Sequence, residues 1–394
     1  MPLPICSARA SAYPPYAHDS TKFHTSLWWD DRTESVAELW LGAGEISRKS
    51  KIRLEVRGDS KVPEKNSKKL SRRHHYLPQM YLRGFADDDG LVWVFDRQNN
   101  TFLHQGVINT AVKKDFYTIV CPDGEKSDAI ETLMANSVEG PTKGIIEKLD
   151  KRNLNWEGED RAILALFVTL LRTRNLAFDR DQNEFTDQFF RWWAKASHST
   201  TEAVEKSLRE YQEKTGRDTT GISAQEMFEM IRDDNYELDN PRQNNIKTMM
   251  SLSLDLASAL FRLNWEIFSA PKGASFVTCD NPFTVVPPPS FDDTLEGFGI
   301  LTPGASTVVP LSRRTAICFR GEGIHGRGAV VYKDFLRQVN LVVAANSERF
   351  VIAREEALLR SLVRKAKLDQ WQPGSRVKMN APGPYAGRPP ECAQ

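Results

Sequence analysis

The sequence is poor in cysteine, and its few cysteines stand far apart. Five are scattered over 394 residues, at positions 6, 121, 279, 318 and 392, and no Cys-x-x-Cys pair occurs. A zinc knuckle or a redox dithiol is built on such a pair, so this spacing disfavours both. An odd, sparse set of cysteines favours a reducing compartment, and we expect the protein to be cytoplasmic.

Long apolar runs and secretory features are lacking as well. The longest unbroken apolar run is Ala162–Val168, whereas a helix that spans a bilayer needs roughly 18 or more apolar residues. The first residues of the chain show no basic stretch followed by an apolar one, which is the pattern of a signal peptide. We therefore expect neither a secretory signal nor a membrane partner.

The chain as a whole has no excess of charge of one sign. It holds 53 Lys and Arg against 52 Asp and Glu, a net charge of +1, which disfavours nucleic-acid binding through gross charge alone. Six basic residues do gather between Lys61 and Arg73, with Glu64 as the one acid among them. This basic segment is either a solvated linker or an arm that binds nucleic acid or another phosphate ligand.

Familiar catalytic motifs are also missing. The sequence contains no G-x-x-x-x-G-K-[ST], H-E-x-x-H or G-x-S-x-G run. Gly321–Gly326 matches G-x-G-x-x-G, but Asn346 stands near the place where a dinucleotide site needs an acid. We therefore expect no nucleotide cofactor. Binding of a divalent metal is left open by the sequence.

The chain divides into three zones that differ in amino-acid composition. Residues 1–71 form a polar, basic extension, residues 72–368 form one globular domain, and residues 369–394 form a disordered tail rich in Pro and Gly. The extension is either a genuine part of the protein or upstream sequence translated from a misassigned start. Peptide mapping of the native protein would decide between these two.

Hydrophobic periodicity predicts an α+β fold for the middle zone. The first half is predominantly helical after an N-terminal β-hairpin at 91–96 and 101–107, and the second half holds a small antiparallel or mixed sheet. The helices are expected at 128–149 with a break at Gly140-Pro141, and at 160–177, 185–211, 224–233, 244–263, 333–345 and 355–367. Strands are expected at 265–269, 275–278, 307–311, 315–320 and 349–353.

One run of residues resembles a family signature. His74-His75-Tyr76-Leu77-Pro78-Gln79-Met80-Tyr81-Leu82 is similar to the opening of a bacterial family called domain of unknown function 4238. Four further segments resemble family marks in the same order: Leu91–Asp96, Lys114–Tyr117, Phe276–Pro282 and Asn346–Ala353. The resemblance covers about residues 72–360 and implies no reaction.

The sequence departs from the family pattern at two places. Cys279 stands where a serine is usual, so a hydroxyl is not essential at that position in this chain. Arg172-Thr173-Arg174-Asn175 stands where the family often has an Arg-Thr-Pro run, so the helix that holds it is expected to end differently.

These motifs together predict a polar site. His75, Gln79 and Arg83 are four residues apart, so a helix through them would set all three on one face. Asp280 follows a strand, and His75 with Asp280 could act as base and orienter, or as two metal ligands. The candidate anion-binding residues are Arg83, Arg172 and Arg174, and the supporting ones are His74, Gln79 and Asn281.

Each candidate also has a purely structural interpretation. The two histidines beside Arg72 and Arg73 could form a basic surface, and Asp280 could close a turn by binding backbone N–H groups. A buried arginine needs either an internal carboxylate, such as Asp255 for Arg172, or an anionic ligand.

Three functions follow from these alternatives. The first is a binding or sensing module with a polar His/Arg/Asp pocket, and the second is a hydrolase of phosphate-containing or nucleic-acid substrates that uses His75 and Asp280. The third is a toxin or a component of a defence system, which rests only on the kind of family that the chain resembles. The sequence does not decide among them.

Overall fold

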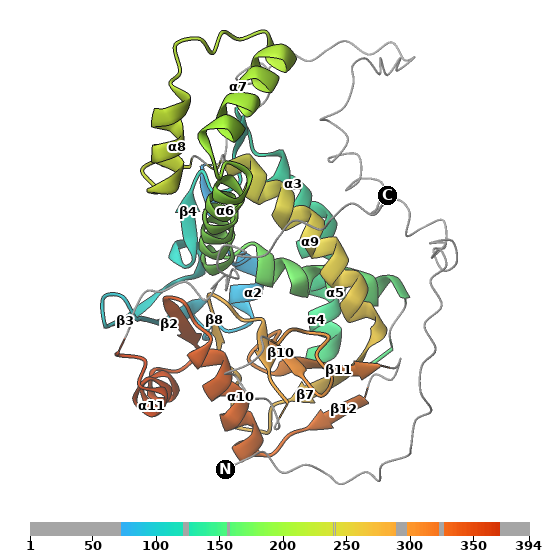
Figure 1. The fold of residues 1–394 in the computed structure, drawn as a ribbon. Coiled ribbons are helices and arrows are strands. Elements are labelled where there is room, and N and C mark those ends of the chain that lie inside the picture. The colour runs from blue at the N-terminus through green and yellow to red at the C-terminus, as the bar shows by residue number, and fades with distance from the viewer. Residues whose placement is uncertain are drawn as a thin grey trace, which may run out of the picture.

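Two sheets and a set of helices make up the part of the chain that the computed structural model describes, residues 72–120, 126–155, 158–238, 240, 242–288, 298–322 and 327–370. More residues lie in helices than in strands, and each sheet is small, so the predicted α+β class is confirmed. The expected extension at 1–71 and nearly all of the expected tail lie outside the described residues. Figure 1 shows the two sheets at one end of the molecule and α6, α7 and α8 toward the other.

The first sheet has four antiparallel strands and contains the predicted N-terminal hairpin. Its spatial order is β3 (Thr101–Gly106), β2 (Leu91–Asp96), β13 (Phe350–Ala353) and β8 (Thr278–Cys279). The hairpin turns at Asn100, whose positive φ of 50° suits asparagine better than most side chains. Strand β13 pairs with both β2 and β8, so three distant motifs of the sequence meet in this sheet.

The second sheet has five strands and is mixed, as predicted for the second half of the chain. Its order is β12 (Arg327–Val330), β7 (Leu263–Ser269), β11 (Thr315–Glu322), β10 (Ser306–Pro310) and β9 (Thr284–Val286). Only β12 runs parallel to its neighbour. Burial alternates along β7, which places Trp265 and Ile267 against the helices.

Two smaller ladders flank these sheets. Strand β1 (Arg73–His75) pairs with β4 (Val112–Lys114), and β5 (Ile119–Val120) pairs with β6 (Lys126–Ser127). The short helix α2 (Gln79–Arg83) follows β1, and a 3-10 turn, η2 (Val107–Asn109), precedes β4. The opening motif therefore begins as a strand and continues as a helix.

The remaining helices are α3 (Ala129–Met134), η3 (Ala135–Glu139), α4 (Gly140–Asp150), α5 (Gly158–Thr173), α6 (Leu176–Ser197), α7 (Thr201–Thr215), α8 (Ala224–Arg232), α9 (Arg242–Arg262), α10 (Lys333–Ala345) and α11 (Glu356–Ala366). The largest apolar cluster joins α5 and α9 to β2, β7 and β11. None of the helices in the described part of the chain is long and apolar enough to cross a bilayer.

The helix expected at 160–177 ends earlier than its apolar pattern suggested. Helix α5 stops at Thr173, and α6 begins at Leu176. Asn175 separates them because its side-chain oxygen accepts the backbone N–H of Phe178 at 2.8 Å, which caps α6. Likewise, the helix expected at 185–211 is divided into α6 and α7, and Thr200 caps α7.

The break expected at Gly140-Pro141 is absent. Helices α3 and α4 run on through the π-helical turn η3, and Pro141 falls in the first turn of α4. Proline lacks an N–H, and a wider turn before it accommodates the missing helical hydrogen bond. The π turn ends at Glu139, a residue that proves to hold a buried arginine.

Candidate functional site

His75 is the last residue of β1 and is linked to the helix that follows it. Its Nδ1 lies 3.5 Å from the side-chain nitrogen of Gln79, and Arg83 donates to the side-chain oxygen of Gln79 at 3.2 Å. The three residues that the sequence placed on one face therefore form a hydrogen-bonded row, although His75 lies ahead of α2. Arg83 is exposed at the end of this row.

The imidazole of His75 has a neighbour at each nitrogen. Its Nε2 lies 3.1 Å from the carbonyl oxygen of Ile108, so this nitrogen carries the proton and donates, while Nδ1 accepts from Gln79. Burial lowers the pKa of His75, and the positive charges of Arg174 and Arg73 add to this effect. The ring is therefore uncharged at neutral pH, and hydrogen bonds hold both of its nitrogens.

His74 points to the other side of β1, as alternation along a strand requires. It is fully buried, and its Nδ1 accepts the backbone N–H of Tyr117 at 2.7 Å. Its ring stacks on the Tyr117 ring with centroids 5.8 Å apart. The two neighbouring histidines thus serve different environments and do not form a basic surface patch together.

Arg174 is only 1% exposed, and its guanidinium is surrounded by internal partners. It donates to Glu139 at 2.6 Å and to the carbonyl oxygen of His75 at 2.6 Å, and Glu131 lies 3.8 Å away. Tyr117 covers the guanidinium with its ring and donates its hydroxyl to the Arg174 carbonyl. The anionic partners of this arginine are therefore two carboxylates of its own chain.

The same cluster shifts the pKa values of its members. Burial works against the charge of Arg174, but Tyr117, Glu139 and Glu131 outweigh it and raise its pKa. Burial also raises the pKa of Glu131, which Arg174 only partly offsets. A buried arginine between two acids is stable only while all three remain, because each charge loses its hydration on folding.

Asp280 is buried at the end of β8, and backbone N–H groups surround its carboxylate. It accepts from Glu348 at 2.8 Å, from Arg349 at 2.7 Å and from Phe350 at 3.1 Å. Burial raises the pKa of Asp280 to about 6, although the N–H groups of Arg349 and Phe350 lower it. Asp280 therefore anchors the segment that leads into β13, some 70 residues later in the chain.

Asn281 connects this turn to the start of α6. Its side-chain oxygen accepts from Asn175 at 3.0 Å, and Asn346 donates to its backbone oxygen at 2.7 Å. The Arg-Thr-Arg-Asn run and the Asp-Asn-Pro run are thus in direct contact. The side chain of Arg172 is half-buried, and its backbone oxygen accepts from Asn175.

The two residues proposed to act together each bind other partners. Among the described residues, no hydrogen bond or ion pair joins His75 to Asp280. Tyr76 lies close enough to Asp280 for the carboxylate to raise the tyrosine pKa, after the larger effect of burial. The Tyr76 hydroxyl is buried and has no hydrogen-bond partner in the part of the chain that the structure describes.

Sequence reasoning missed several members of this framework. Tyr117 belongs to the Lys114–Tyr117 motif and Asn175 to the run that contains Arg172 and Arg174, whereas Glu131 and Glu139 are ordinary helical acids with no signal in the sequence. Two basic residues, Arg72 and Arg73, bind Asp115 and Asn109, while positions 61–71 lie outside the described residues. Within the described ranges, no group of three His, Cys, Asp or Glu side chains is placed to hold a metal.

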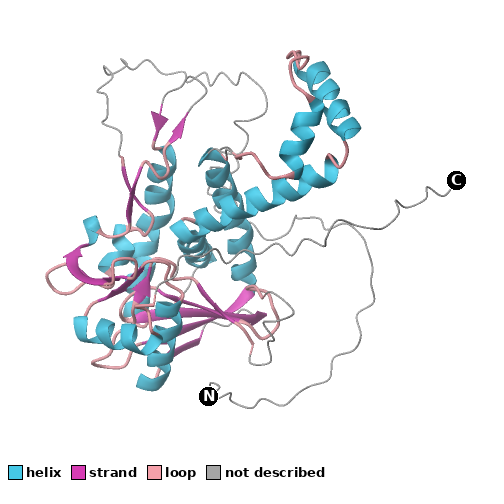
Figure 2. Ribbon diagram, turned by 60° about the vertical axis from the view of Figure 1, so that its left-hand side comes forward, coloured by secondary structure: helices cyan, strands magenta, loops and turns pink. Residues whose placement is uncertain are grey.

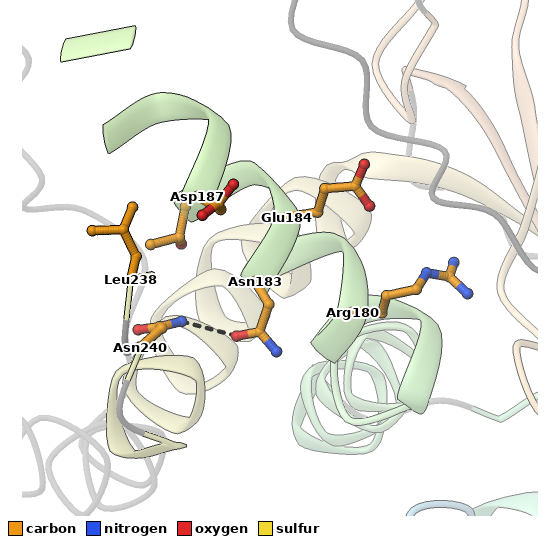
Figure 3. A pocket seen from close by; sticks show the side chains of 7 residues that line it. Arg180, Asn183, Glu184, Asp187, Leu238 and Asn240 are labelled. Carbon is orange, nitrogen blue, oxygen red and sulfur yellow. Dashed lines mark hydrogen bonds between the residues drawn. The ribbon is translucent and has the colours of Figure 1, made fainter. Parts of the chain in front are cut away.

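A pocket of about 480 Å³ lies elsewhere, beside α6. Figure 3 shows side chains of α6 on one side of it and the segment before α9 on the other. Its lining residues are Arg180, Asn183, Glu184, Thr186, Asp187, Leu238 and Asn240. None of them was a sequence candidate.

Most of the lining side chains are polar, and several of them already have partners within the protein. Asn240 donates to Asn183 at 2.9 Å, and Arg191 binds Asp187 at 2.8 Å. Arg180 is paired with Glu348 and with Asp181. Among the described residues, Glu184 receives a hydrogen bond from Gln188 but has no ion-pair partner.

The pocket is tied to the buried framework through one residue. Glu348 binds Arg180 with its carboxylate, and its backbone N–H is one of the three that Asp280 holds. Asp280 thereby fixes the position of a side chain that orients a pocket residue. The motif that contains Asp280 is therefore linked to the pocket only indirectly, through the position of Glu348.

Comparisons with known proteins agree with the motifs. A family model described as Protein of unknown function (DUF4238) matches residues 73–357, which confirms the family that the sequence resembled. No curated protein and no solved structure matches the chain.

Proposed function

Since this chain belongs to the DUF4238 family, whose description assigns no reaction, we propose a function from the geometry of its own pocket. The protein is a binding or sensing module that holds a small polar ligand bearing an ammonium group beside α6. The observation that supports this most directly is Glu184, a carboxylate that lines the pocket without an ion-pair partner in the described part of the chain.

The size and the chemistry of the pocket favour such a ligand. Its volume of about 480 Å³ falls within the range of small-molecule sites, roughly 300–1,000 Å³. Arg180 and Asp187 already have charged partners within the protein, so Glu184 leaves a negative charge for the ligand to neutralise. The side-chain nitrogen of Asn183 offers donors for the rest of the molecule, whereas Asn240 already donates to Asn183 and Asn245 and accepts from Asn244.

The framework motifs support binding more than catalysis. The hydrogen-bonding atoms of His75 and Asp280 are occupied by Gln79, by Ile108 and by three backbone N–H groups. Groups held in this way stiffen a scaffold, and a rigid scaffold lowers the cost of ordering a binding site.

Calorimetric titration with 1,4-diaminobutane, arginine and glutarate, which has no amine, tests the proposal. We expect binding of the two amine-bearing probes and not of glutarate, and a loss of that binding in Glu184→Gln. Glu147→Gln is the matched control, because Glu147 is an exposed carboxylate on α4 outside the pocket. Absence of amine binding, or equal binding by the wild type and Glu184→Gln, would contradict the proposal.

Hydrolysis at His75 and Asp280 is the second candidate. The observation in its favour is that burial raises the pKa of Asp280 to about 6, nearer to neutrality, and lowers the pKa of His75, which keeps the imidazole uncharged as a general base requires. A phosphodiesterase and phosphatase screen, run with metal analysis on the wild type and His75→Ala, tests it. A melting curve of each protein must accompany the screen, since His75 also supports the fold.

A further inference from the structure

Two arginines that are distant in the sequence are bound to one loop, residues 84–88, which follows α2. The backbone N–H of Arg313 donates to the carbonyl oxygen of Gly84 at 2.9 Å. The guanidinium of Arg354 donates to the carbonyl oxygen of Ala86 at 3.0 Å and forms an ion pair with Asp88 at 2.8 Å. We call residues 84–88 the anchor loop.

The anchor loop connects the ends of strands from both sheets. Arg313 lies in the turn between β10 and β11 of the five-stranded sheet, and Arg354 directly follows β13 of the four-stranded sheet. These sheets and their loops occupy the end of the molecule away from the projecting pair of helices α7 and α8 (Figure 2). The two arginines therefore belong to a surface other than the pocket beside α6, whose lining includes neither of them.

The turn that holds Arg313 is fixed by Asp150, the last residue of α4. The Asp150 carboxylate accepts from the hydroxyls of Ser312 and Thr315, both at 2.6 Å. The Ser312 oxygen in turn accepts the backbone N–H of Thr315 at 3.1 Å. A Cβ at Gly84 would lie only 3.2 Å from the Cβ of Ser312, so this turn and the anchor loop are in close contact. The backbone that carries Arg313 is therefore set in place before any ligand arrives.

The arginine side chains of this turn have no internal partner. Among the described residues, neither Arg313 nor Arg314 makes a side-chain hydrogen bond or an ion pair. Arg313 is half-buried, and Arg314 is exposed. Burial lowers the pKa of Arg313, and the positive charges of Arg354 and Arg314 add to this effect, which Asp88 and Asp150 offset only in part. A half-buried guanidinium without an acceptor has lost hydration that an anionic ligand would replace.

The carboxylate that pairs with Arg354 is weakly held. The side chain of Asp88 is 89% exposed, whereas that of Arg354 is 18% exposed. The hydrogen bond and the charge of Arg354 lower the pKa of Asp88, and the charge of Arg313 adds to this effect, so one carboxylate lies within reach of both arginines. An exposed ion pair of this kind is weak in water. An anionic ligand can therefore displace Asp88 from Arg354.

We propose that Arg313, Arg314 and Arg354 form a binding site for a phosphate group, either free in solution or carried by a small molecule. The phosphate takes the place of the Asp88 carboxylate at Arg354 and receives hydrogen bonds from Arg313. Asp88 then acts as an internal competitor, which covers Arg354 while the site is empty.

Shape and charge favour a phosphate over a carboxylate. One forked arginine satisfies a planar carboxylate, whereas a tetrahedral phosphate offers oxygens to arginines that come from different segments. A phosphate monoester carries a charge of about −1.5 to −2 at pH 7. The unpaired Arg313 and Arg314 supply two positive charges to match it.

The charge of the whole chain favours a single phosphate group over a nucleic-acid strand. A strand needs basic residues along an extended surface, because each phosphate contact adds to the affinity. The chain has a net charge of only +1. A small group of arginines at the anchor loop therefore fits a small ligand better than a polymer.

Calorimetric titration of the full chain with inorganic phosphate, phenyl phosphate and acetate tests the proposal. We expect at least one of the two phosphates to bind and acetate not to bind. Tighter binding of phenyl phosphate would assign the site to a phosphorylated small molecule, and tighter binding of inorganic phosphate would assign it to the free ion.

The double variant Arg313→Gln with Arg314→Gln should weaken phosphate binding at least about ten-fold, because it removes two charged donors. Arg209→Gln is the matched control, at an exposed arginine on α7, and should bind as the wild type does. Neither Arg313 nor Arg314 has a side-chain partner in the described part of the chain, so the double variant should fold. Its melting temperature should equal that of the wild type without phosphate, and phosphate should raise only that of the wild type.

Asp88→Asn gives a second test of opposite sign. It removes the carboxylate that competes for Arg354, so phosphate should bind about two- to five-fold more tightly. Asp89→Asn is the control, because it removes the same charge one residue away, at an exposed side chain that has no ion pair with Arg354. This control should change the affinity less than Asp88→Asn does.

Several results would overturn the proposal. They are the absence of binding by both phosphates, equal binding by the wild type and the double arginine variant, acetate binding as tight as phosphate binding, and an effect of Asp88→Asn no larger than that of Asp89→Asn. Binding of a DNA oligonucleotide, but of neither small phosphate, would assign the arginines to nucleic acid instead. None of these results bears on amine binding at Glu184, so this inference and the proposed function fail separately.

Discussion

The side-chain amide of Asn175 donates to the side-chain oxygen of Asn281 at 3.0 Å, across 106 residues of sequence. Asn175 also caps α6, and Asn281 receives the side chain of Asn346 on its backbone oxygen. One hydrogen bond between two buried amides therefore joins the start of α6 to the turn after β8. Both amides lack access to bulk water, so their hydrogen bonds to each other and to nearby backbone groups satisfy them.

Asn281→Ala should lower the free energy of unfolding by about 1–2 kcal/mol, because it removes the hydrogen bonds of the Asn281 side chain to Asn175 and Asn346, while the Asn175 amide keeps two backbone carbonyl oxygens as acceptors. Urea denaturation measures this loss. Asn235→Ala, at an exposed position, is the control and should change stability by less than about 0.5 kcal/mol. In a double-mutant cycle with Asn175→Ala the two costs should be less than additive, and full additivity would show that the contact contributes nothing.

Arg174→Met should destabilise the protein by about 3–5 kcal/mol, since Glu131 and Glu139 would remain partly buried without their cation. Arg83→Met is the matched control at an exposed arginine and should cost little. Adding Glu139→Gln to Arg174→Met should recover part of the loss, because it removes one uncompensated charge. If Arg174→Met were as stable as Arg83→Met, the internal ion pairs would not be what holds this arginine.

Local patterns explain what the sequence could predict. The hairpin of β2 and β3 follows from alternation and a four-residue turn, and α5 from an apolar run that is buried on nearly every side. The α+β class follows from the order of such segments. Each of these inferences uses contacts between residues that are close together in the chain.

Contacts between residues that are far apart in the chain explain what the sequence could not predict. Nothing in the residues near Asp280 indicates that its partners are the backbone of Glu348, Arg349 and Phe350. The pairing of Arg174 with Glu139 depends on a π turn, just where Gly140-Pro141 predicts a break in the helix. Hydrogen bonds link several of the candidate residues across the fold, but what each of them does depends on which neighbours the tertiary fold supplies.

Asp280 should make stability fall as the pH rises through weakly acidic values. Its pKa is raised by burial to about 6 from an ordinary 3.8, so the folded state binds the proton more tightly than the unfolded state does. The resulting stabilisation is complete below about pH 4 and is lost as the pH passes about 6. Two units of pKa correspond to about 3 kcal/mol.

The free energy of unfolding of the wild type, minus that of Asp280→Asn, should therefore decrease by a few kcal/mol between pH 4 and pH 7, by about as much as the pKa shift implies. Urea denaturation at several pH values gives this difference directly. Asp369→Asn, at an exposed carboxyl, should show no such change. A difference that stayed flat across the window would mean that Asp280 titrates as an ordinary surface acid.

Tyr76 and Tyr117 are both buried, and removal of their hydroxyls should have opposite effects. Tyr117 donates its hydroxyl to the Arg174 carbonyl at 2.6 Å, so Tyr117→Phe should cost about 1–3 kcal/mol. The Tyr76 hydroxyl has no partner among the described residues and lies near the Asp280 carboxylate. Tyr76→Phe removes a buried polar group that gains nothing in return, so it should leave stability unchanged or raise it by up to about 1 kcal/mol. Thermal and urea unfolding of the two variants, measured side by side, check the sign. If Tyr76→Phe lowered the free energy of unfolding as much as Tyr117→Phe, a water or ligand atom would have to bridge Tyr76 and Asp280. The buried framework would then contain a polar cavity of its own, in addition to the pocket beside α6.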